Sequence, residues 1–103
     1  MTYASLTDLE GRLGSAVYVQ LTDDAGTGSA DPSKAAEALS GAEGEMNSYL
    51  GRRYAVPVDV TADEQLAAVL KSMALDLAEY RLYARRPTMP TTVAHRHDAA
   101  AHW

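Results

Sequence analysis

Apolar side chains recur at helical spacing in two long stretches of the chain, and the stretch in the second half has the more regular pattern. Its steps alternate between four and three residues over about five turns, which is typical of a helix with one buried face. This pattern predicts a helix over 62–86, capped by Thr61 or Asp63 and ended by Pro87. The buried stripe comprises Leu66, Leu70, Met73, Leu77, Tyr80 and Ala84.

The other long stretch predicts a helix over 32–51. Asp31 is a favourable N-cap residue and Pro32 a favourable first helical residue. Glycines such as Gly41 and Gly44 each weaken this helix by about 1 kcal/mol relative to Ala. They also permit another backbone to approach closely, so we expect tight neighbours. The apolar stripe comprises Ala35, Leu39, Ala42, Met46, Tyr49 and Leu50.

A shorter helix is predicted at the N-terminal end, over 5–13. Two capping boxes compete to start it: Thr7 with Glu10, and the weaker combination of Ser5 with Asp8. Its apolar face comprises Leu6, Leu9 and Leu13.

The rest of the chain contains shorter signals. Val17, Tyr18 and Leu21 form an apolar piece that fits either one helical turn or a brief strand. Residues 23–31 are rich in Asp and Gly and predict an irregular loop. A last helix is predicted over 92–103.

These elements predict an all-α fold in a single domain over 1–103. It is a small bundle of about four helices, with a long irregular loop between the first and second helical regions. The net charge of −5 argues against sequence-independent binding to nucleic acid phosphates. The absence of Cys excludes disulfides and thiolate metal sites. We see neither a signal peptide nor a membrane span, and expect a protein that is cytosolic when made.

The chemistry-bearing residues do not assemble into a catalytic, cofactor or metal site. Three histidines lie near the end of the chain, His95, His97 and His102. His95 and His97 do not share a helical face, and Asp98 is the only acidic ligand nearby, so a solvated or interface helix explains the histidines better than a metal site does. The acidic residues of the 23–31 loop do not alternate as calcium ligands do. No serine lies in a nucleophile motif. We therefore expect a protein that is not an enzyme and has no cofactor.

Asp76 interrupts the flank of the best apolar stripe and is the most conspicuous charged residue of the chain. One alternative is a catalytic acid, which has no partner acid or base in the sequence. The favoured interpretation is a largely buried structural pair in which Asp76 accepts hydrogen bonds from Arg52 or Arg53, with Tyr54 or Tyr80 nearby.

A second, narrower apolar stripe runs roughly opposite the first on the 62–86 helix, through Ala68, Leu75 and Leu82. A helix that is apolar on two sides is central in its bundle or shared with another subunit. We therefore take Leu75 and Leu82 as interface candidates. Trp103 is a third, because a lone Trp at an abrupt end is expected to pack on another chain.

Several fragments, in this order and spacing, resemble one family over nearly the whole chain. The family is the Mu-like phage and prophage head–tail connector (adaptor, head-completion) family, long described as a domain of unknown function. The fragments are Tyr3–Gly14, Gln20–Asp23, Ala38–Tyr54, Val56–Pro57, Ala74–Leu82 and Arg86–Pro87.

The resemblance implies a helical adaptor that forms a ring, typically of twelve copies, beneath the portal. Such a ring extends the DNA channel, joins head to tail and meets the next neck or tail-completion protein. Members normally continue into a further helix and a C-terminal arm, so this chain is expected to lack that arm. The expected location is the virion neck, reached from the host bacterial cytoplasm during assembly.

The acidic charge agrees with packaged DNA passing through the lumen without specific binding. Ring packing through a heterologous interface agrees with the two-sided helix. Two other hypotheses remain: a helical dimer that serves as a protein-binding or regulatory module, and a small hydrolase. The mass in solution distinguishes ring, dimer and monomer.

Overall fold

Helices make up all the regular structure that the computed structural model describes, which covers residues 3–51, 64–86 and 89–101. Within these ranges there is no strand, so the all-α prediction is confirmed, with five helices where about four were expected. In chain order they are α1 (Leu6–Leu13), α2 (Ser15–Thr22), α3 (Pro32–Leu50), α4 (Glu64–Tyr83) and α5 (Thr91–Ala101).

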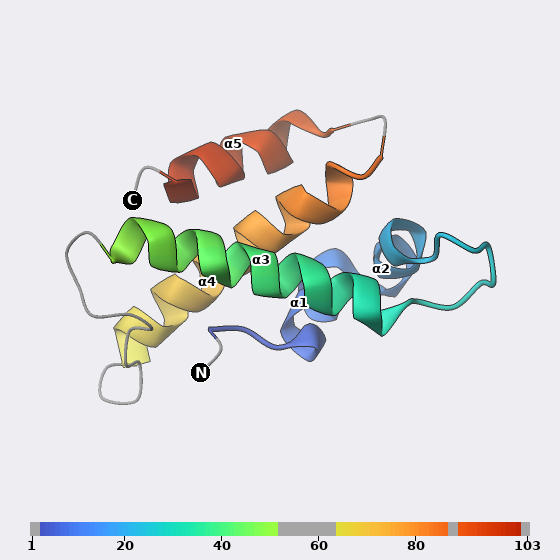
Figure 1. The fold of residues 1–103 in the computed structure, drawn as a ribbon, viewed down its shortest axis with the longest axis horizontal. Helices are drawn as coiled ribbons and strands as arrows, with labels where there is room; N and C mark the ends of the chain where they lie inside the picture. The colour runs from blue at the N-terminus through green and yellow to red at the C-terminus, as the bar shows by residue number, and fades with distance from the viewer. Residues whose placement is uncertain (1–2, 52–63, 87–88, 102–103) are drawn as a thin grey trace.

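The two long helices, α3 and α4, form the centre of the fold as a crossing antiparallel pair (Figure 1). The short helices α1 and α2 pack against each other and against both long helices. Helix α5 lies along α4, and the 23–31 loop extends from one end of the molecule (Figure 1). The molecule is elongated, 42 × 25 × 19 Å, with a radius of gyration of 13.7 Å.

The core lies where α1, α3 and α4 meet. Burying each large apolar side chain there contributes about 1.5–3 kcal/mol to the free energy of folding. The largest apolar side chains that are fully buried are Leu9, Met46, Leu70, Leu77 and Leu82.

Helix α1 begins at the weaker of the two predicted capping boxes. The Ser5 hydroxyl accepts a hydrogen bond from the backbone N–H of Asp8, and the Asp8 carboxylate accepts one from the N–H of Ser5. The preference for Thr7 with Glu10 was therefore wrong. The helix therefore begins two residues earlier than a Thr7 cap would place it.

The piece around Tyr18 forms a helix of two turns, longer than the single turn or strand expected. It begins after Gly14, whose φ of 82° and ψ of 150° turn the chain between α1 and α2. Buried Tyr18 and Leu21 anchor α2 to the core. Two arginines that follow α4 bind carbonyl groups in the last turn of α2. Arg86 donates to the carbonyl of Gln20 and Arg85 to the carbonyl of Leu21, both at 2.9 Å. Helix ends leave such carbonyls without a helical partner, so these contacts stabilise α2 from a distant part of the chain.

The loop over 23–31 contains neither helix nor strand, and the Asp23 carboxylate organises it. This carboxylate accepts hydrogen bonds from the backbone N–H groups of Thr27 (2.9 Å) and Gly28 (2.7 Å). These N–H donors hold the pKa of Asp23 below its ordinary value. The loop then ends at Asp31, whose side chain caps α3 as predicted.

The remaining boundaries lie close to the predicted ones. Helix α3 ends at Leu50 and α4 at Tyr83, somewhat before the expected 51 and 86. The cap candidates Thr61 and Asp63 and the end of the predicted 92–103 helix lie outside the described residues.

The expectation that small residues admit another backbone is wrong at Gly41. A Cβ added there would lie 2.8 Å from a guanidinium nitrogen of Arg81, so this glycine makes room for a side chain from α4. At Gly44 nothing lies within 4 Å of an added Cβ. Nothing in the structure explains the glycine at that position.

Candidate interaction site

Asp76 lies at the junction of three helices, and its partners on the described helices come from α1 and α5. Its Oδ1 atom accepts a hydrogen bond of 2.6 Å from Arg12 on α1 and lies 3.7 Å from the Nε atom of Arg96 on α5. The Asp76 side chain is 17% exposed, so it is only partly buried. Arg52 and Arg53, which the sequence suggested as partners, lie outside the described residues.

Glu79 lies one turn further along α4 and extends this network. It is 6% exposed and accepts a hydrogen bond of 2.6 Å from the Nη2 atom of Arg96. That hydrogen bond, with the nearby carboxylates, raises the pKa of Arg96, so the guanidinium stays charged. These side chains thus form a chain of alternating charges that joins α1, α4 and α5, in the order Arg12, Asp76, Arg96 and Glu79.

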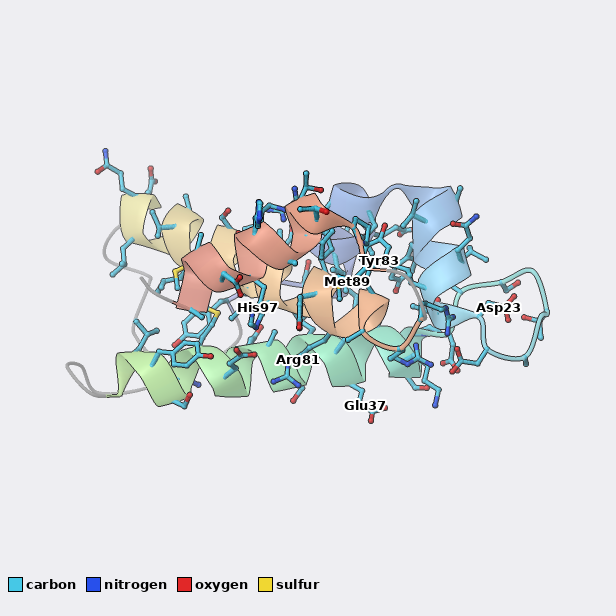
Figure 2. All side chains as sticks on the ribbon, turned by 90° about the horizontal axis from the view of Figure 1, so that it is seen from above. Asp23, Glu37, Arg81, Tyr83, Met89 and His97 are labelled. Carbon is cyan, nitrogen blue, oxygen red and sulfur yellow. The ribbon has the colours of Figure 1, made fainter. Side chains whose placement is uncertain are left out.

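A second cluster joins α3 to α4 and α5 through Glu45. Its carboxylate accepts hydrogen bonds from Tyr49 (2.5 Å) and Arg81 (3.1 Å), and it lies 3.2 Å from the Nε2 atom of His97. The His97 ring stacks on Tyr80 with 4.0 Å between centroids. Figure 2 shows Arg81 and His97 directed toward α3 from the two helices above it.

Opposing effects act on the Glu45 carboxyl, and the hydrogen bonds prevail. Burial alone raises its pKa, whereas the hydrogen bonds from Tyr49 and Arg81 and the charge of His97 lower it. The net result is a lowered pKa, so Glu45 is ionised over the neutral range. The adjoining groove of about 520 Å³ includes Lys34, Glu37 and Arg85 in its lining, and Glu37 points outward from α3 (Figure 2).

A third polar contact attaches the N-terminal segment to α3. Glu43 is 9% exposed, and its Oε1 atom accepts hydrogen bonds from the backbone N–H groups of Tyr3 (3.1 Å) and Ala4 (3.4 Å). The Tyr3 hydroxyl donates to the Asn47 side chain at 2.7 Å. No local pattern predicts this contact, because its partners are about forty residues apart in the chain.

The apolar interface candidates Leu75 and Leu82 are core residues, which corrects the prediction made from the second stripe. Leu75 is 6% exposed and Leu82 fully buried within the single chain. Leu75 and Leu82 are buried because α1, α3 and α5 pack around α4 from different directions. The third candidate, Trp103, lies outside the described residues.

The exposed apolar surface lies instead on the first half of α4. Val69 is 41% exposed and is the only large hydrophobic side chain with this degree of exposure among the described residues. Ala68 beside it is also exposed. An isolated exposed valine is common on monomers, so this surface is small.

The fold and the site together define a small helical domain whose charged side chains join its helices to one another. The sequence profile of the family described as "Bacteriophage Mu, Gp36" matches residues 3–103. The chain therefore belongs to this family and is a Mu-like phage protein. Comparison with curated proteins found no match. In the part of the chain that the structure describes, no helix is long and apolar enough to cross a bilayer.

Proposed function

We propose that this protein is a structural head–tail adaptor, or head-completion protein, of a Mu-like phage or prophage. In this proposal several copies, typically twelve, form a ring beneath the portal. The ring extends the DNA channel and presents a surface to the next neck or tail-completion protein. Its role is architectural rather than enzymatic, and its location is the virion neck.

The observation that carries the proposal is the family match over residues 3–103, which makes the chain a Mu-like phage protein. The order and spacing of the fragments that resemble head–tail connectors add the specific role. The all-helical fold agrees with the helical architecture that this resemblance implies.

The net charge also supports a channel role. A chain with a charge of −5 repels the phosphate backbone at long range, so a ring of such chains does not retain DNA that passes through it. The basic side chains of the described helices lie mostly in internal ion pairs, such as those of Arg12 and Arg96, and add little free positive charge.

The contact between ring neighbours must use surface that the single chain leaves exposed. Because a ring closes through heterologous contacts, each copy presents two different surfaces to its neighbours. Leu75 and Leu82 are buried and cannot contribute. We assign one of the two surfaces to the exposed face in the first half of α4, centred on Val69 with Ala68 beside it.

Deletion of the gene from an inducible prophage tests the role directly. We expect lysates with DNA-filled heads and complete tails that remain separate, because the joining ring is missing. Complementation with wild-type protein restores tailed particles. Normal tailed particles without the gene, or a failure to form heads or tails at all, would contradict the adaptor role.

A variant tests the assigned contact surface separately. Val69→Asp introduces a charge at an exposed position, so we expect it to fold normally but fail to restore tailed particles. Ala36→Asp, at an exposed position of α3, controls for the added charge itself. Full complementation by Val69→Asp refutes the placement of the contact, but not the adaptor role.

A further inference from the structure

Helix α5 buries much less apolar surface than the other long elements of the fold. Of its eleven residues only Val93 and Ala100 are buried, whereas α4 buries eight side chains, among them Leu70, Leu77 and Leu82. Only Ala100 of α5 belongs to the main core cluster. The apolar driving force that holds α5 in place is therefore small, because hydrophobic stabilisation scales with the apolar area removed from water.

Charged and aromatic contacts supply most of the remaining attachment. Arg96 donates to Glu79 at 2.6 Å and approaches Asp76 at 3.7 Å. His97 lies 3.2 Å from Glu45 and stacks on Tyr80. These two consecutive residues of α5 thus bind three carboxylates and one aromatic ring of α3 and α4.

Most of the side chains beneath α5 keep other partners without it. Asp76 retains its hydrogen bond from Arg12, and Glu45 retains those from Arg81 and Tyr49. Among the three carboxylates, Glu79 alone depends on α5 for the ion pair described here. Two of the three carboxylates beneath α5 therefore keep a hydrogen-bond partner on α1 to α4 when α5 is absent.

We propose that α5 is an ionically latched helix, which detaches from α4 as a unit while α1 to α4 stay folded. The latch consists of Arg96 and His97 with their partners Glu79, Asp76 and Glu45. Opening uncovers a surface of α4 that carries Asp76, Glu79 and Tyr80. The protein then has a closed and an open form with different surfaces, and ionic strength shifts the balance between them. This inference is independent of the adaptor role.

Hydrogen exchange of the full-length protein, followed by mass spectrometry, tests the latch. In Arg96→Gln we expect the amides of 91–101 to exchange about tenfold faster or more, given the usual contribution of charge-assisted hydrogen bonds. The amides of α3 keep their wild-type rates. Lys71→Gln is the matched control: Lys71 is 48% exposed against 43% for Arg96, and its ion pair with Asp8 joins α4 to α1.

A salt titration of the wild-type protein gives a second readout that needs no substitution. At about 1 M NaCl, where the screening length is only about 3 Å, exchange of 91–101 accelerates while α3 is unaffected. The proposal is overturned if α5 and α3 exchange at the same rates in every condition. It is equally overturned if Arg96→Gln leaves 91–101 as slow as Lys71→Gln does.

Discussion

Shortening Leu82 to Ala tests whether the second stripe of α4 is core, as the structure places it. Leu82 is fully buried, so the substitution removes apolar contacts and leaves a cavity. Leu-to-Ala changes at such sites lower the free energy of unfolding by about 2–5 kcal/mol. A domain of this size has a total stability of about 5–15 kcal/mol, so the loss is a large fraction.

Urea unfolding followed by circular dichroism measures this loss. With an m-value of about 1–3 kcal/mol per M, the midpoint should fall by about 0.7–5 M. Val69→Ala is the matched control, since Val69 is 41% exposed and a surface truncation changes stability by about 0.5 kcal/mol or less. If Leu82→Ala unfolds at the same urea concentration as Val69→Ala, Leu82 is not a core residue and the packing around α4 is wrong.

Three further predictions concern polar groups and backbone geometry. Asp76→Ala should lower the unfolding free energy by about 1–3 kcal/mol, because it strands a partly buried arginine. Asp24→Ala, at a side chain 39% exposed against 17% for Asp76, should lower the melting temperature less; equal shifts would contradict the network. Gly14→Ala should cost about 1–3 kcal/mol, because its backbone conformation is nearly exclusive to glycine. Gly44→Ala should stabilise the chain by about 1 kcal/mol in the same melts, and a stabilising Gly14→Ala or a destabilising Gly44→Ala would refute this account. Burial alone raises the pKa of the Glu45 carboxyl, but the hydrogen bonds that the carboxylate accepts lower it, and the net result is a lowered pKa. Unfolding then takes up protons, so the urea midpoint should fall as the pH drops below the ordinary carboxyl value of 4.5, and less steeply in Glu45→Gln.

Local signals predicted the long helices well, because each carries both a start signal and an apolar period. Asp31 caps α3 as its sequence suggested. Three members of the predicted stripe of α4, Leu70, Met73 and Leu77, are buried. Leu66 and Tyr80 are half-buried, and Ala84 is exposed beyond the end of the helix. The role of the second apolar stripe of α4, which includes Leu75 and Leu82, was ambiguous. A helix that is apolar on two faces is either central in its bundle or shared with another subunit, and only the positions of α1, α3 and α5 decide between these alternatives.

Polar pairings were not predictable, because they join residues far apart in the chain. Arg12 and Asp76 are 64 residues apart, and no pattern in one segment announces its partner in the other. The same holds for α2, whose carbonyls are bound by Arg85 and Arg86 more than sixty residues later. The apolar piece that forms α2 carries no stop signal of its own, so the sequence alone did not predict two helical turns there.

Cryo-electron microscopy of purified, DNA-filled heads that lack tails tests the central proposal most directly. The account predicts a ring of this protein bound beneath the portal, with rotational symmetry and with the DNA channel running through its centre. Neighbouring copies should meet at the Val69 face of α4. Heads that carry no density for this protein, or a protein that purifies only as a free dimer and never binds the portal, would contradict the account.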